Sequence, residues 1–252
     1  MGALRNNGSP PNDHVESPRT LYCDDELLVI DKPAGMHVFP SNEREQAVLT
    51  YIVQQWPEMG EIGDPQFPAI THRLDQGTSG LLLAARTQHA YQALRTMFRR
   101  KLVHKTYLAL VEGEIARSCS IDLPIGARHR RSRKVVVAVG ERDRRTLRSL
   151  LPALTSLYPL GSARGFTFCR VEMTTGVRHQ IRAHLSHLGH PIAGDTLYGA
   201  TQLLPEITDR FFLHAWRLDL AHPTSQQALS FTCPLPEKLT AVIARLGIPI
   251  PT

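Results

Sequence analysis

The stretch H-R-L-D-Q-G-T-S-G-L-L-L-A-A, residues 72–85, places one carboxylate, Asp75, in a tight polar segment just before an apolar run. The run 81–85 is typical of a buried strand, because five consecutive apolar residues leave no polar face. A lone aspartate at such a place is ordinarily a turn residue or a helix cap. The order of residues around Asp75 is more specific than the aspartate itself, so the rest of the chain has to decide its role.

Apolar runs and periodic apolar positions predict the elements around this stretch. Further strands are expected at 27–30, 107–111 and 166–173, each closed by turn residues. Helices are expected at 49–56, 87–102, 178–188 and 236–246. Thr87 is the expected cap of the second helix, whose apolar stripe extends to Leu102. Pro57, Gly189 and Gly247 are expected to end the other three.

The predicted strands and helices do not alternate regularly, and a basic loop at 126–134 interrupts any strand–helix–strand rhythm. This pattern favours an α+β fold with a mixed, mostly antiparallel central sheet flanked by helices. Residues 1–18 are polar and proline-rich, which is typical of a disordered tail. We therefore expect a tail over residues 1–18 and one folded domain over residues 19–252.

Composition narrows the class of protein. No apolar run approaches the roughly 20 residues that span a bilayer, and the N-terminus lacks the apolar core of a signal peptide. The four cysteines form no C-x-x-C pair, which argues against a zinc site and fits reduced thiols. We expect a cytoplasmic protein with no membrane partner.

The net charge of +6 is concentrated in three basic clusters, at 99–101, 128–134 and 142–148. Such runs are ordinarily solvated surface. Arginine predominates in them, however, and its planar guanidinium suits phosphate. The charge pattern therefore favours a nucleic acid, RNA or DNA, as the partner.

A second informative segment, residues 176–199, carries Arg178 and Arg182 four positions apart, on one face of the expected helix. Arg182 follows the apolar Ile181 and points partly inward, where a buried arginine needs an anion such as Asp75. An alternative reading is a metal site built from His184, His187 and Asp195. No H-E-x-x-H arrangement supports it, so we expect no metal.

Both segments resemble the motifs of the RluA-type RNA pseudouridine synthases. Segment 176–199 is similar to the family pattern T-G-R-x-H-Q-I-R-x-H-L-x-x-x-G-H-P-I-x-G-D-x-x-Y-G. Segments 29–35, 105–113 and 212–215 match three further family elements in the same order. The resemblance covers residues 21 to about 236. It departs at Asp31, Phe39, Val177, Arg178 and Arg86, none of which is a catalytic position of the family.

The resemblance implies the pseudouridine synthase fold and isomerisation of uridine to pseudouridine in rRNA or tRNA, without a cofactor. It assigns Asp75 as the essential carboxylate, with Arg182 beside it and Tyr107 against the uracil. Leu213 would wall the base, and Arg73 would fill the space that the flipped base leaves. The expected RNA-binding residues are Arg178, His179, Arg130, Arg131 and Arg133.

Two rival functions remain open at this point: a non-catalytic RNA-binding module on the same fold, and a metal-dependent hydrolase. The tail is too short for the S4-type RNA-binding domain that some family members carry, so we expect the catalytic domain to act alone, as a monomer. A compact stem-loop in tRNA or large-subunit rRNA is then the expected substrate, and DNA is not.

Overall fold

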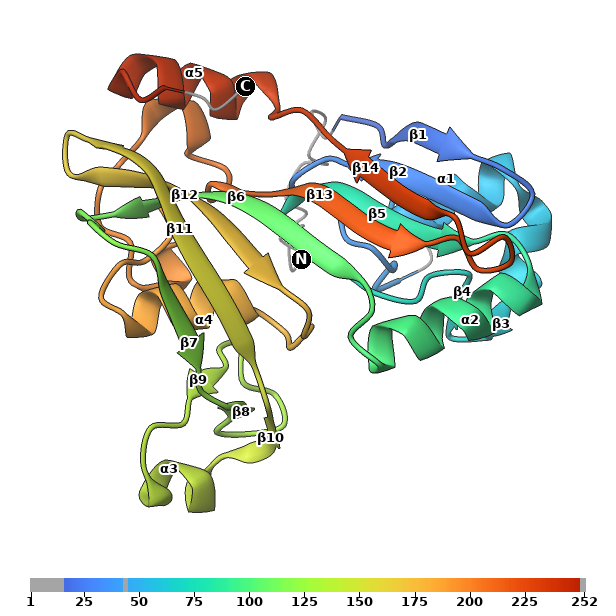
Figure 1. Cartoon of the computed structure of the whole chain (residues 1–252), viewed down its shortest axis with the longest axis horizontal. Coiled ribbons are helices and arrows are strands. Elements are labelled where there is room, and N and C mark those ends of the chain that lie inside the picture. The colour runs from blue at the N-terminus through green and yellow to red at the C-terminus, as the bar shows by residue number, and fades with distance from the viewer. Residues whose placement is uncertain (1–15, 43–44, 250–252) are drawn as a thin grey trace, which may run out of the picture.

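A nine-stranded sheet forms the centre of the computed structural model, which describes residues 16–42 and 45–249 (Figure 1). Its strands follow the order β1-β2-β5-β13-β6-β12-β11-β7, and β14 pairs with β13 outside this path. Their bounds are β1 Arg19–Cys23, β2 Leu27–Lys32, β5 Ser79–Ala85, β6 His104–Glu112, β7 Cys119–Asp122, β11 Leu154–Ala163, β12 Phe166–Met173, β13 Leu213–Ala221 and β14 Ala228–Thr232.

All neighbouring strands of this sheet run antiparallel except β5 and β13, which are parallel. The mixed, mostly antiparallel α+β fold predicted from the sequence is therefore confirmed. The parallel pair depends on Gly80, which has φ +105°, because a Cβ there would lie 2.3 Å from the carbonyl oxygen of Ala215. This close approach brings the chain around Asp75 next to the start of β13.

The helices are α1 Val48–Gln55, α2 Gln88–Arg99, α3 Glu141–Thr146, α4 Gln180–His187 and α5 Glu237–Leu246. Short 3-10 segments lie at η1 Pro57–Glu61, η2 Thr196–Tyr198 and η3 Pro205–Ile207. The Thr87 hydroxyl accepts a hydrogen bond from the Ala90 amide, as expected of the cap of α2. Gly247 ends α5 in the left-handed conformation, with φ +73°. Among the described helices, none combines the length and apolar character that a bilayer crossing requires.

Three expectations about helix ends are wrong. α2 ends at Arg99, so Leu102 does not extend its apolar stripe and is 52% exposed. α4 begins only at Gln180, because His179 before it is left-handed with φ 54°. Arg178 therefore lies outside the helix and does not share a helical face with Arg182. Leu188, expected on the buried side of that helix, is exposed.

The basic region expected as a loop folds into a small lobe of its own. β8 Ile125–Ala127, β9 Val136–Val137 and β10 Arg148–Leu151 form a three-stranded sheet, and α3 connects β9 to β10. We call residues 125–151 the basic lobe; Figure 1 shows it projecting from one end of the molecule. Of the predicted tail, residues 1–15 lie outside the described residues, so the tail stays a prediction.

Candidate active site

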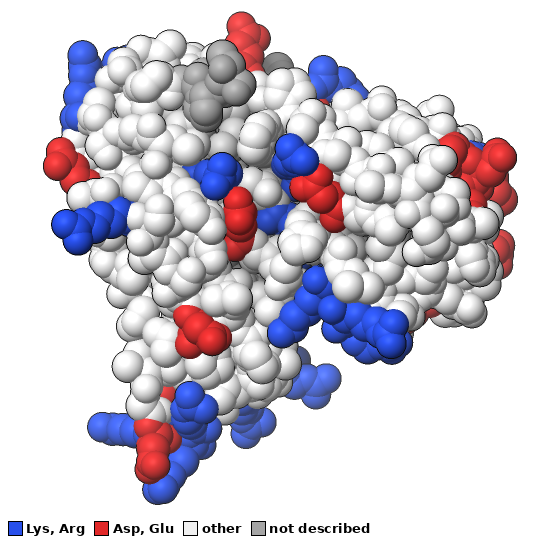
Figure 2. All heavy atoms as spheres, viewed as in Figure 1, with Lys and Arg blue, Asp and Glu red and all other residues white. Residues whose placement is uncertain are grey.

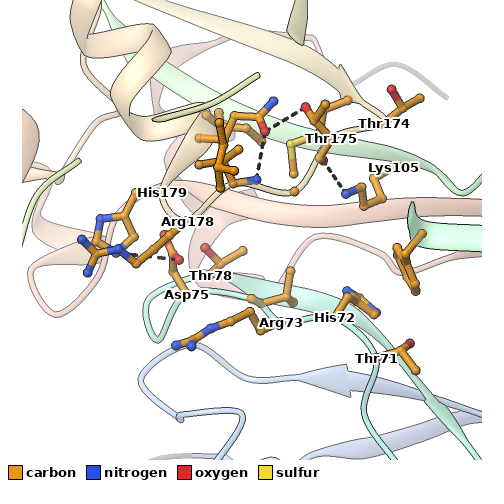
Figure 3. A pocket seen from close by; sticks show the side chains of 18 of the residues that line it. Thr71, His72, Arg73, Asp75, Thr78, Lys105, Thr174, Thr175, Arg178 and His179 are labelled. Atoms are coloured by element: carbon orange, nitrogen blue, oxygen red, sulfur yellow. Dashed lines mark hydrogen bonds and ion pairs between the residues drawn. The ribbon is translucent and has the colours of Figure 1, made fainter. Parts of the chain in front are cut away.

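A cavity of about 700 Å³ opens between α2 and the chain that runs from β12 into α4. It collects seven of the ten site residues that the sequence predicted, from four separate parts of the chain. They are Arg73, Asp75, Tyr107, Arg178, His179, Arg182 and Leu213. Figure 3 shows Arg73, Asp75, Arg178 and His179 among them.

The segment carrying Asp75 is fixed by its neighbours on both sides. Leu74 is buried in the core, and the Asp75 carbonyl accepts a hydrogen bond from the Thr78 amide at 3.0 Å. The next carbonyl, that of Gln76, accepts from the buried Lys32 ammonium at 3.1 Å and from the Gly35 amide at 2.9 Å. The early motif at 29–35 thus supports the loop that presents the carboxylate.

Arg182 holds two carboxylates at once. Its Nη1 donates to Asp75 Oδ2 at 3.1 Å, while Nε and Nη2 donate to the two oxygens of Asp195 at 2.6 and 2.9 Å. The guanidinium also lies over the rings of Tyr198 and Phe211, 4.9 and 4.4 Å from their centroids. Two carboxylates and two aromatic faces stabilise the cation, and the pKa of Arg182 is raised despite its burial. Asp75 therefore faces a fixed positive charge.

The wall beside Asp75 is apolar and comes from two paired strands. Tyr107 on β6 pairs with Ala215 on β13. Leu213 lies two residues before Ala215 on the same strand, so it shares a face of the sheet with it. Tyr107 and Leu213 are both buried and both line the cavity. Burial and the nearby Asp75 carboxylate raise the pKa of Tyr107, so its phenol is protonated at neutral pH. A flat aromatic ring and a branched aliphatic side chain form a surface that suits a planar ligand.

His179 connects the cavity to the basic lobe. Its Nε2 is 3.9 Å from Asp75 Oδ1, and its Nδ1 is 3.0 Å from the Tyr198 hydroxyl. That hydroxyl accepts a hydrogen bond from the Val135 amide of the basic lobe. Burial lowers the pKa of His179 to about 4, so the ring is neutral at pH 7.

Arg130, Arg131 and Arg133 lie outside the cavity, exposed on the basic lobe. One contact links them to the site: Arg178 Nη2 donates to the Ser132 carbonyl at 2.8 Å. Figure 2 shows Lys and Arg side chains gathered on the lobe and along the edge that faces it across a notch in the surface. The role of these arginines in RNA binding stays a prediction.

Lys105 is a cavity residue to which the sequence analysis gave no role. It is buried on β6, and its ammonium donates to the Thr175 carbonyl at 2.6 Å. Desolvation lowers its pKa to about 8, which is near neutrality for a lysine. Its place in the 105–113 motif, two residues before Tyr107, is the signal that could have indicated it, since alternate strand residues share a face.

Asp195 entered the sequence analysis only through the alternative reading of a metal site, which we did not favour, and in the structure its carboxylate binds Arg182. Both of its oxygens bind Arg182, and His184 is occupied by the Thr155 hydroxyl and the Leu123 carbonyl. Within residues 16–42 and 45–249, no group of three His, Cys, Asp or Glu side chains is arranged to hold a metal ion. The four cysteines are free thiols.

Comparisons with known proteins agree with the motifs. The chain matches the family described as RNA pseudouridylate synthase over residues 26–187. It is 37% identical over 234 residues to the ribosomal large subunit pseudouridine synthase D of Nitrosomonas europaea, covering 89% of this chain and 64% of that protein. The protein of the same name from Pseudomonas aeruginosa is 33% identical over 240 residues, with coverages of 90% and 71%.

A comparison with solved structures finds proteins with similar names. The solved structure of human RNA Pseudouridylate Synthase Domain Containing 1 superposes with a TM-score of 0.72 at 25% identity, over 91% of this chain and 89% of that one. The chain thus spans just under two thirds of the Nitrosomonas protein's length but nearly all of the human structure.

Proposed function

This chain belongs to the RluA-type family of RNA pseudouridine synthases, and from that premise we propose that it isomerises uridine to pseudouridine in RNA, with Asp75 as the catalytic carboxylate. One observation carries the assignment to Asp75. It is the carboxylate that Arg182 binds on the cavity side, beside the apolar wall of Tyr107 and Leu213.

The reaction breaks the N1–C1′ bond of uridine and forms a C5–C1′ bond, after which the proton on C5 leaves and N1 gains one. Atoms and electrons balance without an oxidant or an external nucleophile. Asp75 starts the sequence by one of two routes, attack on C1′ or removal of the C2′ proton. Both routes require the ionised carboxylate, which the Arg182 cation stabilises.

The surrounding residues have separate tasks in this proposal. Arg182 orients the carboxylate, and the protonated phenol of Tyr107 packs against one face of the uracil. Leu213 closes the pocket beneath the base. Arg73, which lines the cavity and is exposed, extends below Asp75 in Figure 3 and would occupy the space that the flipped nucleotide leaves in its stack.

The RNA itself would lie over the notch, with the arginines of the basic lobe binding phosphates and carrying little sequence information. Large-subunit rRNA is the first substrate to test, because the relatives from Nitrosomonas and Pseudomonas are named for that subunit. A stem-loop in tRNA is the second. We further propose that the protein works as a monomer in the cytoplasm.

The central test replaces Asp75 by Asn, since an amide is neither a nucleophile nor a base. We expect Asp75→Asn to bind RNA as the wild type does and to release no tritium from RNA that contains 5-[³H]uridine. Asp209→Asn is the matched control, because Asp209 is an exposed carboxylate paired with Lys238. Turnover in Asp75→Asn comparable to that of the control would place the active site elsewhere.

The target can be found by deleting the gene and mapping pseudouridine through carbodiimide-dependent primer stops. We expect modification to disappear at a uridine in the loop of a hairpin. Loss confined to a site without a local hairpin would contradict the stem-loop preference.

A further inference from the structure

A short hairpin at one end of the cavity presents an aromatic ring that the catalytic proposal does not use. β3 Gly63–Asp64 and β4 Phe67–Pro68 pair antiparallel, with Asp64 opposite Phe67. Phe67 is 44% exposed and lines the same cavity as Asp75. A single exposed apolar side chain is common on protein surfaces. This one differs because it borders the site of chemistry and because its hairpin is held in place.

The backbone amides of the hairpin are held by side chains of α2. The Gly63 amide donates to the side-chain oxygen of Gln88 at 2.8 Å, and the Asp64 amide donates to the Tyr91 hydroxyl at 3.3 Å. Gly63 has φ +83°, and a Cβ there would lie 2.3 Å from the Tyr91 ring, so the hairpin can rest on that ring only with glycine. The position of Phe67 is therefore set before any ligand arrives.

A second aromatic residue supports Phe67 from the core side. Phe39 lies edge-on to it, with ring centroids 4.8 Å apart and the planes at 63°. Phe39 is half-buried, packs against the hydrophobic core and also lines the cavity. Edge-to-face packing fixes the orientation of a ring. The pair is thus a preformed platform with one exposed member.

Two arginines of α2 also line the cavity, and one of them is linked to the hairpin through Tyr91. They are Arg95 and Arg99, which lie one helical turn apart. Arg95 donates to the Tyr91 hydroxyl at 3.2 Å and lies over the Tyr91 ring, so it is tied to the residue that carries the hairpin. An aromatic ring next to an arginine is the combination with which proteins bind single-stranded nucleic acid, the ring stacking a base and the cation meeting the backbone.

We propose that Phe67, supported by Phe39, stacks an unpaired nucleobase that neighbours the target uridine, while Arg95 binds the backbone phosphate beside it. The inference rests on the proposed function and deepens it by naming the substrate class. A base held on this platform has left its own stack, so the RNA is unpaired at the target and at an adjacent position. The cavity of about 700 Å³ is larger than one uridine needs, which leaves room for this neighbour.

The test measures binding, so it does not depend on turnover. The probe is a fluorescein-labelled RNA hairpin whose loop carries one uridine between two adenosines. In two further RNAs, one or the other flanking adenosine is replaced by an abasic ribose. Dissociation constants are measured by anisotropy for the wild type, Phe67→Leu and Phe67→Trp. Leu203→Ala is the control, because Leu203 is 87% exposed and does not line the cavity.

We expect Phe67→Leu to weaken binding of the intact hairpin about 5- to 150-fold, the range that a lost base–aromatic stack gives. Phe67→Trp keeps a stacking face and binds like the wild type, as does Leu203→Ala. For the wild type, one of the two abasic RNAs should bind more weakly than the intact hairpin RNA by a similar factor. That same abasic RNA should bind Phe67→Leu no more weakly than it binds the wild type. Equal abasic penalties in the wild type and Phe67→Leu would overturn the platform.

Tritium release from the intact hairpin separates this inference from the proposed function. If the wild type isomerises the RNA hairpin and Phe67→Leu does so with the same KM as the wild type, the result contradicts the platform and leaves the proposed function intact. A wild type whose binding depends on one flanking base and on Phe67, yet which isomerises no RNA, contradicts the isomerase proposal and leaves the platform standing.

Discussion

At the scale of single residues, the site depends on how Arg182 divides its hydrogen bonds. Two of its nitrogens bind Asp195, which is almost completely buried, and the third reaches Asp75. Asp195 is therefore the partner that fixes the guanidinium. Asp75 accepts a hydrogen bond from Nη1, the one nitrogen that does not bind Asp195. This arrangement lets a carboxylate sit at a cavity wall with its cation already in place.

Removing the arginine is expected to destabilise the whole protein. Arg182→Ala leaves the buried Asp195 and the partly buried Asp75 without their cation, which costs about 3–5 kcal/mol of unfolding free energy. Adding Asp195→Asn removes one of the stranded charges, so the double variant should recover part of that loss. Urea denaturation of the three proteins measures both effects. A wild-type midpoint for Arg182→Ala would show that the ion pairs contribute nothing.

At the scale of elements, the basic lobe is a structural unit joined to the active site at defined points. The Ser132 carbonyl accepts from Arg178, and the backbone of Val135 meets the Tyr198 hydroxyl. Val135 and Tyr198 also share a small apolar cluster with Ile125, Val137 and Ala183. The lobe thus presents its exposed arginines next to the cavity from a fixed base.

Neutralising the lobe should weaken RNA binding without regard to sequence. The triple change of Arg130, Arg131 and Arg133 to Gln is expected to lower affinity for matched and mismatched RNAs alike. It should also reduce the slope of log affinity against log salt by roughly 2, about 0.7 per lost phosphate contact. The control neutralises Lys238 and Arg245 on α5, the helix that Figure 1 shows at the opposite end of the molecule. Loss of affinity for a single RNA sequence would mean that the arginines read bases.

At the scale of the whole molecule, several histidines are held neutral inside the fold. His214 is fully buried, with Nδ1 2.8 Å from the Ser79 hydroxyl and Nε2 3.0 Å from the Cys233 carbonyl. Burial lowers the pKa of His214 and that of His179 to about 4, and that of His72 to about 3. Each of these rings resists protonation as long as the protein stays folded.

Stability should therefore begin to fall as the pH drops below about 6.5, the ordinary pKa of histidine. Between pH 6.5 and pH 4 the unfolded chain binds more protons at these histidines than the folded chain, so unfolding free energy rises with pH in this window. Each histidine contributes up to about 1.4 kcal/mol per pH unit. Denaturant titrations across the window measure the slope. His214→Gln should reduce the slope of unfolding free energy against pH, because it removes one of the contributing histidines. His187→Gln, at an exposed position, should leave the slope unchanged. A wild-type unfolding free energy that does not vary with pH in this window would contradict the prediction.

The sequence alone predicted the elements whose signals are local. Continuous apolar runs identified β2 and β5, because a strand buried on both faces has no polar positions. The Thr87 cap and the Gly247 stop were readable for the same reason, since each acts within one helical turn. Five short motifs in the same order indicated the family, and the resemblance then assigned Asp75 as its carboxylate.

The sequence named Asp75 as an anion for Arg182, 107 residues away. Only the tertiary structure showed that Asp195 binds two of the three guanidinium nitrogens. His179 has a left-handed backbone, so α4 begins after it and Arg178 lies outside the helix. The basic region expected as a loop forms a three-stranded sheet instead. Local patterns carry the preferences of short segments, whereas these contacts depend on the path of the whole chain through space.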